Sequence, residues 1–335
     1  MRVLIVKTSS LGDLIHTFPA ITDAVSARKE LEFHWLVEEA FQEVPVWHPA
    51  VSRTIPIALR RWRKQWFHAW RNGEPGKLRA QLKGGGYDLV IDAQGLLKSA
   101  LPARMAGTEV AGYDRRSIRE PLASFFYQHR YSVSREAHAI ERIRRLFALS
   151  LDYALPQTPV DYGLELPRAG RDASLVFLHG TTWPSKQWPE NYWIELAGLA
   201  AEAGFEVLWP WHSDEERARA ERLCGQGGGR LLERLGLTGM RDCLAAASGV
   251  VGVDTGLAHL AAAVGTPAVT LYGPTRTELT GAVGDRQKNL SVEFQCAPCM
   301  RKRCDQKGEV VPPCFATLPP GRVWQALQAQ MGGAS

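Results

Sequence analysis

The sequence contains no long apolar run. No stretch approaches the roughly 18 apolar residues that a membrane-spanning helix requires. The first apolar run, residues 3–6 (VLIV), stops at Lys7, and no small-residue cleavage site follows it. We therefore expect no membrane span, no secretory signal and a cytoplasmic location, where the six cysteines would stay reduced.

The sequence also has no G-x-G-x-x-G motif at the end of a strand. The turns that could bind a phosphate read TSSLGD at residues 8–13 and DTGLAH at residues 254–259. This absence disfavours a nicotinamide oxidoreductase, although paired strand–helix halves would suit one. We accordingly expect no cofactor.

The sequence does contain strand–helix alternation, in two blocks. A chain of 335 residues is too long for one ordinary core, and it shows no solenoid repeat. Prolines and glycines punctuate residues 155–172, where the periodicity dissolves before it restarts. We predict an α/β fold of two Rossmann-like, doubly wound domains that face each other across a cleft. The predicted parts are residues 1–160, residues 172–318 and a terminal helix over residues 321–332.

The first block opens on a strand, a polar turn and a helix. Residues 2–7 (RVLIVK) are apolar without alternation, which is typical of a strand buried on both faces. Ser9 and Ser10 offer hydroxyls and backbone donors in the turn, and Gly12 allows a tight swing into the helix. Asp13 then falls in the first helical turn, at the edge where open parallel sheets bind ligands. From spacing alone, a helix cap is a better interpretation of Asp13 than catalysis.

The second block contains a comparable turn. Asp254, Thr255 and Gly256 follow a buried strand and begin a helix, whose free N–H groups can bind an anion. His259 lies one helical turn beyond Thr255, and Lys186 lies in the loop after an earlier strand. Together these residues suit a diphosphate. The alternative is an ordinary capped helix start with a core histidine.

Residues 60–71 combine cations with aromatic rings. The cations are Arg60, Arg61, Arg63, Lys64 and Arg71, and the rings include Trp62, Trp66, Phe67 and Trp70. A solvated helix face is one interpretation. Half-buried indole rings beside cations also suit an interface with anionic head groups. The corresponding rival function, a non-catalytic module for anionic lipid or nucleic acid, leaves the DTG turn and Lys186 unexplained.

Five motifs together resemble one family. They are V-K-T-S-S-L-G-D-x-x-H-T-x-P-A, R-x-W-R-K-x-W-F, V-I-D-A-Q-G-L-x-K-S-A, R-E-P-L-A-S-x-F-Y and V-D-T-G-L-x-H-L. In combination they resemble the lipopolysaccharide heptosyltransferases of glycosyltransferase family 9, and among these the heptosyltransferase I group, over the chain up to about Arg286. Heptosyltransferase II, which adds heptose to heptose, is the nearest alternative, and the K-T-S-S opening favours group I.

The resemblance implies a GT-B fold and an inverting, metal-independent transfer. L-glycero-D-manno-heptose would pass from ADP-heptose to the first Kdo of Kdo2-lipid A, on the cytoplasmic face of the inner membrane. Peripheral membrane contact is implied, and no nucleic-acid partner. Asp13 would accept the proton of the Kdo hydroxyl, while Lys186 and the helix start at Thr255 meet the charge on the leaving diphosphate. Closure of the cleft would exclude water.

The resemblance also assigns residues to the two substrates. It makes Asp13 the catalytic base, which reverses the preference for a cap. Expected donor-side residues are Lys186, Glu216 for the ribose, Thr181, Thr182, Asp254, Thr255, Gly256 and His259. A solvated glutamate is the simpler interpretation of Glu216. Expected acceptor-side residues are Ser9, Ser10, Gly12, Arg60, Arg61, Arg63, Lys64 and Arg119.

Four cysteines depart from this resemblance. Cys296, Cys299, Cys304 and Cys314 form a C-x2-C-x4-C-x9-C array, in which only the first pair has firm ligand spacing. A structural zinc or redox cluster and unliganded thiols both stay open as interpretations. We expect neither to take part in catalysis.

Overall fold

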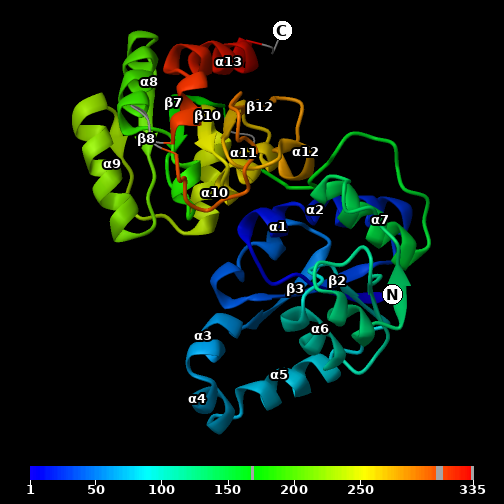
Figure 1. Ribbon diagram of the computed structural model, residues 1–335. Helices are drawn as coiled ribbons and strands as arrows, with labels where there is room; N and C mark the ends of the chain where they lie inside the picture. Colours follow the sequence, from blue (N-terminus) through cyan, green and yellow to red (C-terminus); the bar gives the residue numbers. More distant parts are fainter. Residues whose placement is uncertain (167–169, 307–311, 333–335) are drawn as a thin grey trace. The chain divides into compact units, whose positions relative to one another are not determined.

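The computed structural model describes residues 1–166, 170–306 and 312–332, and the chain forms two compact units, residues 1–165 and 166–335 (Figure 1). Each unit contains one six-stranded parallel sheet accompanied by helices. The strand order changes direction once in each sheet, which is the doubly wound arrangement. The predicted α/β class is therefore confirmed. None of the helices in the described ranges is long and apolar enough to cross a bilayer.

The sheet of the first unit has the order β3-β2-β1-β4-β5-β6. Its strands are β1 (Arg2–Val6), β2 (Glu32–Glu38), β3 (Val51–Ile57), β4 (Leu89–Asp92), β5 (Val110–Tyr113) and β6 (His129–Tyr131). β1 pairs in parallel with β2 and β4. Its residues from Val3 to Val6 are fully buried, because both faces of a central parallel strand are covered.

The helices of the first unit begin with a pair that the sequence predicted as one. They are α1 (Leu11–Ile15), α2 (Phe18–Ala27), α3 (Leu59–Lys64), α4 (Trp66–Arg71), α5 (Glu74–Lys83), α6 (Leu97–Arg104) and α7 (Ala139–Leu151), with 3-10 turns η1 (Glu39–Phe41), η2 (Pro45–Trp47) and η3 (Pro121–Phe126). The prediction of a single helix after Gly12 was wrong. Gly12 lies inside α1. Pro19 is the second residue of α2, and in a continuous helix its ring would clash with the carbonyl of Ile15, so the helix is interrupted between Ile15 and Phe18.

The sheet of the second unit has the order β12-β11-β10-β7-β8-β9. Its strands are β7 (Asp172–Leu178), β8 (Glu206–Trp209), β9 (Arg230–Leu231), β10 (Ala247–Val253), β11 (Ala268–Tyr272) and β12 (Gln287–Ser291). Its helices are α8 (Glu190–Glu202), α9 (Asp214–Gly227), α10 (Leu237–Ala246), α11 (Gly256–Ala263), α12 (Thr277–Thr280) and α13 (Pro320–Gly332), with 3-10 turns η4 (Pro184–Lys186) and η5 (Pro313–Thr317).

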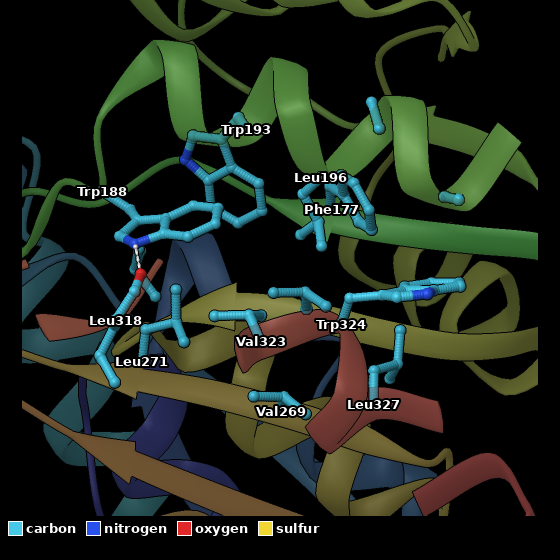
Figure 2. Close-up of a cluster of buried hydrophobic side chains, with 14 of the residues drawn as sticks. Phe177, Trp188, Trp193, Leu196, Val269, Leu271, Leu318, Val323, Trp324 and Leu327 are labelled. Carbon is cyan, nitrogen blue, oxygen red and sulfur yellow. Dashed lines mark hydrogen bonds between the residues drawn. The ribbon is translucent and has the colours of Figure 1, made fainter. Parts of the chain in front are cut away.

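An aromatic core joins α8 and α13 to this sheet (Figure 2). The Phe177 ring lies 5.6 Å from that of Trp193, and the Trp188 ring meets Trp193 edge-on at 4.9 Å. Edge-to-face aromatic pairs stabilise a core beyond their buried area. Trp188 also donates a hydrogen bond of 3.1 Å to the carbonyl of Leu318. This bond fixes the segment that enters α13 beside the loop after β7.

Candidate active site

In the first unit, the strand order reverses between β1 and β4. In open parallel sheets, the carboxyl ends of the strands at such a reversal are where ligands bind. The loop after β1 carries Thr8, Ser9 and Ser10 and leads to Asp13, and the loop after β4 carries Gln94. We call these the β1–β4 loops.

Asp13 presents an ionised carboxylate at this point. Its Oδ2 accepts hydrogen bonds from the backbone N–H of Ser10 (2.8 Å) and from the Ser10 hydroxyl (2.9 Å). Its Oδ1 lies 3.5 Å from Nζ of Lys7, and its side chain is 44% exposed. Burial opposes ionisation, but the Lys7 charge and the Ser10 hydrogen bonds outweigh it and lower the pKa of Asp13. Asp13 therefore caps α1 and also presents a carboxylate that can accept a proton.

Side chains that sequence reasoning missed hold these loops in place. Lys7 is buried and donates a hydrogen bond of 3.0 Å to the carbonyl of Ala93. The Gln94 amide accepts from the backbone N–H groups of Thr8 and Ser9 and donates to the Ser9 carbonyl at 2.8 Å. Lys98 donates to the Ser9 hydroxyl at 3.2 Å. A lysine ending a doubly buried strand was the available signal for Lys7.

The predicted basic patch divides into anchored and exposed cations. Arg61 pairs with Glu74 at 2.9 Å and with Glu39 at 3.3 Å, and these hydrogen bonds raise the pKa of its guanidinium. Trp62 is buried and donates to the Glu74 carboxylate at 2.7 Å. The expectation that Arg61 and Trp62 both serve an anionic interface is therefore wrong for Trp62, and Arg61 is already occupied by two carboxylates.

The other cations of this patch remain exposed. Arg60 lies with its guanidinium 5.3 Å from the ring centre of Phe41, and its backbone N–H bonds to Glu38. Arg63 and Lys64 are exposed on α3. Arg119 is likewise exposed, and its neighbour Glu120 bonds to the backbone of the loop after β4.

In the second unit, the strand order reverses between β7 and β10. Lys186 ends the loop after β7, and Asp254 follows β10 directly. The Lys186 ammonium lies 2.6 Å from Oδ2 of Asp254 and 4.7 Å from the ring centre of Trp183. Thr275, in the loop after β11, donates to the same Asp254 oxygen at 2.6 Å. Asp254 thus holds groups from two neighbouring loops, and Thr275 was missed from the sequence.

The start of α11 lies beside this cluster. Thr255 is the N-cap residue with extended backbone, and its hydroxyl makes no capping hydrogen bond within the described chain. The first N–H groups of a helix have no partner inside the helix, so they are available to an anion. Nε2 of the buried His259 lies 4.0 Å from Oδ1 of Asp254. The structure thus places Lys186, Asp254, Thr255, Gly256 and His259 next to one another, as expected from the sequence.

Glu216 caps the neighbouring helix α9. Its carboxylate accepts from the backbone N–H groups of His212 and Ser213, and the Ser213 hydroxyl accepts from the Glu216 N–H. A Cβ on Gly180 would lie 2.6 Å from the Glu216 carboxylate, so the loop after β7 passes very close to it. Thr181 and Thr182 lie in that loop. The ribose role expected of Glu216 stays a prediction.

The comparisons with known proteins agree with this geometry. The pattern of Glycosyltransferase family 9 (heptosyltransferase) matches residues 76–309. The chain is 52% identical to lipopolysaccharide heptosyltransferase 1 of Pseudomonas aeruginosa over 99% of its own length and 98% of that protein. The chain belongs to glycosyltransferase family 9.

Solved structures of this family have the same fold. Escherichia coli heptosyltransferase WaaC with ADP has a TM-score of 0.87 and 42% identity, covering 98% of this chain and 100% of that one. The same enzyme with ADP-2-deoxy-2-fluoro heptose has a TM-score of 0.84, also at 42% identity, covering 98% and 99% of the two chains. The family 9 glycosyltransferase described here therefore has the GT-B fold that the sequence predicted, and its predicted class as a heptosyltransferase is confirmed.

Proposed function

We propose that this family 9 glycosyltransferase transfers L-glycero-D-manno-heptose from ADP-heptose to the first Kdo of Kdo2-lipid A, with inversion. The observation that carries the proposal is that the two sheets present different chemical groups at the points where their strand order reverses. One presents an ionised carboxylate, Asp13, and the other presents Lys186 beside an open helix N-terminus. The 52% identical relative is named lipopolysaccharide heptosyltransferase 1, and the similar WaaC was solved with ADP and with an ADP-heptose analogue.

On the acceptor side, Asp13 accepts the proton of the Kdo hydroxyl as that oxygen attacks the anomeric carbon. Lys7 and Ser10 keep the carboxylate ionised before the reaction. A carboxylate with a low pKa is a weak base, so proton transfer comes late, when the sugar already resembles an oxocarbenium ion. The attack from the face opposite the leaving group inverts the anomeric centre.

On the donor side, the diphosphate binds at the start of α11. The N–H groups beginning at Gly256 and the Lys186 ammonium meet the negative charge that grows on the departing ADP. Asp254 is itself negative and so does not bind the diphosphate; its part is to hold Lys186 and Thr275. Glu216 and the loop that contains Thr181 and Thr182 bind the nucleoside.

The acceptor is an anionic lipid, and the surface of α3 and α4 fits one. Trp66, Phe67 and Trp70 are 58%, 71% and 65% exposed on α4. Arg60, Arg63 and Lys64 supply cations from α3 beside these rings. Exposed aromatic rings next to cations bind the interfacial region of anionic membranes. We propose peripheral contact with the cytoplasmic face of the inner membrane through this surface, with Arg119 on the acceptor sugar.

Release of ADP with two acceptors tests the proposal. The purified enzyme and ADP-heptose are incubated with Kdo2-lipid A or with the same lipid already carrying one heptose. We expect rapid release with Kdo2-lipid A alone. Preference for the heptosylated lipid would instead identify a heptosyltransferase II. Binding to anionic vesicles without ADP release from either acceptor would identify a lipid-binding module.

A further inference from the structure

The four cysteines of the C-terminal array converge on one small cavity. Cys296, Cys299, Cys304 and Cys314 all line a space of about 20 Å³, together with Ser185 and Pro274. Cys314 is buried, Cys299 and Cys304 are partly buried, and all are free thiols. The volume suits a single small ion or water. Cys224 and Cys243 are also free thiols, but neither lines this cavity.

This cavity adjoins the proposed donor site, because Ser185 and Pro274 in its wall are the neighbours of Lys186 and Thr275. The backbone N–H of Ser185, next to Lys186, donates to the carbonyl of Lys302 at 3.2 Å, and the Ser185 hydroxyl bonds to the Arg301 carbonyl at 2.6 Å. The N–H of Met300 donates to the carbonyl of Pro274 at 2.8 Å. Pro274 precedes Thr275, which holds Asp254. The cysteine segment therefore supports both loops that position the lysine.

The segment itself has little regular structure to keep it rigid. Residues 293–306 form no helix or strand, and Arg301, Lys302 and Arg303 follow one another within it. A loop without regular secondary structure positions its neighbours more firmly when a further link holds the loop itself. Arg301, Lys302 and Arg303 would also complement the negative charge of a metal–thiolate centre.

We propose that Cys296, Cys299, Cys304 and Cys314 bind one thiophilic metal ion of the zinc type, and that this metal clasp positions the loops of Lys186 and Thr275 for the donor. The second part rests on the proposed function. On binding a divalent ion, the four thiols release four protons and leave a centre with a net charge of about −2. Within the described residues no three potential ligands stand in a metal-binding arrangement. Metal binding would therefore require the four thiols, which already line one cavity, to turn toward a common ion.

Metal content of matched cysteine variants tests the clasp. Wild type, Cys304→Ser and Cys224→Ser are purified under reducing conditions with Zn²⁺ in the medium, and bound metal is measured by elemental analysis. We expect about one thiophilic ion per chain in wild type and Cys224→Ser, and little in Cys304→Ser. Replacement by Co²⁺ should give thiolate-to-metal charge-transfer absorption in the first two only. Wild type without metal, without the cobalt band, or with disulfides among these cysteines would overturn the site.

The positioning role is measured separately, as affinity for ADP. We expect Cys304→Ser to bind ADP about fivefold or more weakly, and ADP to tighten zinc binding to wild type by the same factor, because coupling between sites is reciprocal. If Cys304→Ser fails to fold, wild type stripped of metal is used, and reaction with a thiol reagent reports four newly accessible thiols. Equal ADP affinity with and without metal would overturn the positioning role. Failure of metal-loaded wild type to bind ADP would instead contradict the proposed donor site.

Discussion

At the residue scale, two lysine–carboxylate pairs use the same residue types in opposite ways. In the Lys7–Asp13 pair, the lysine side chain is 7% exposed and the carboxylate is 44% exposed. In the Lys186–Asp254 pair, the carboxylate is the more buried member, at 8% against 15%. In the proposed function, the first pair presents an anion to the acceptor hydroxyl, and the second presents a cation to the diphosphate. Burial, more than residue type, separates the two proposed roles.

Removing the Lys7 charge should move the acid limb of the pH–rate profile. Because the Lys7 charge lowers the pKa of Asp13, Lys7→Met should raise that pKa, with only the Ser10 hydrogen bonds left to oppose the effect of burial. More of the base is then protonated in mild acid. We expect kcat to fall several-fold at about pH 5 and to change little at about pH 8. Lys98→Met, which removes a hydrogen bond to Ser9 instead, is the control. Superimposable profiles for wild type and a folded Lys7→Met would contradict this role.

The donor lysine should account for much of the affinity for ADP. A charged hydrogen bond contributes about 1.5–3 kcal/mol, so Lys186→Ala should weaken ADP binding by about 10- to 150-fold in calorimetry. Asp254→Asn should have a smaller effect in the same direction, because it releases Lys186 without removing it. Lys288→Ala, an exposed lysine on β12, should bind ADP normally. If Lys186→Ala also bound normally, the diphosphate would have to lie elsewhere.

At the element scale, α3 illustrates how one basic run divides its work. Arg61 and Trp62 share the Glu74 carboxylate and so attach α3 to α5. Arg60, Arg63 and Lys64 are left for an anionic partner. Within this one basic run, Arg61 therefore has a structural role, and the exposed cations are available to a partner. Substituting the whole run at once would confuse loss of binding with loss of structure.

Substituting only the exposed cations should weaken use of the lipid acceptor. Each charge near an anionic surface contributes about 1 kcal/mol, so Arg60, Arg63 and Lys64→Gln together should raise the acceptor KM about 10- to 100-fold at low salt. The difference should shrink as salt rises, since exposed charges are screened. The KM for ADP-heptose should not change. The matched control substitutes the exposed Lys77, Arg79 and Lys83 of α5 by Gln. Equal acceptor KM values for the two triple variants would show that the exposed cations of α3 form only a solvated helix face.

Elements with strong apolar patterns could be predicted from the sequence, and those defined by their neighbours could not. The runs of β1, β7 and β10 have no alternation, because both faces are covered, and the sequence predicted a strand at each. The edge strands β6 and β9 have only three and two residues, too few for a pattern. The placement of Trp62 depends on Glu74, 12 residues further along the chain, and that of Lys7 depends on Ala93, 86 residues further along. Neither partner could be identified from the sequence pattern.

At the scale of the whole molecule, each unit places its chemistry at the switch point of its own sheet. The loop after β1 leads to the proposed base in α1, and loops after β7 and β10 carry the proposed diphosphate site. The carboxyl ends of central parallel strands are the positions that this fold offers to ligands. Two sheets of the same doubly wound type therefore supply the proposed base and the proposed diphosphate site of one transfer reaction.

Because Lys186 and the start of α11 are proposed to neutralise the leaving diphosphate, the reaction should not depend on Mg²⁺. We expect Mg²⁺ or Mn²⁺ to change kcat by less than about twofold in enzyme treated with EDTA, since Lys186 and the start of α11 supply the positive charge that a metal would otherwise provide. The assay measures ADP release at saturating donor. Inactivation by EDTA that Mg²⁺ reverses and Zn²⁺ does not would contradict the metal-independent mechanism.

Single-turnover kinetics of Asp13→Asn measure whether Asp13 is the base of the transfer reaction. The asparagine Oδ1 can still accept from Ser10, so the cap on α1 is kept while the proton acceptor is lost. We predict that heptose transfer to Kdo2-lipid A slows by about 10²- to 10⁴-fold, while ADP affinity and thermal stability stay close to wild type. A folded Asp13→Asn enzyme that transfers heptose at nearly the wild-type rate would contradict the account.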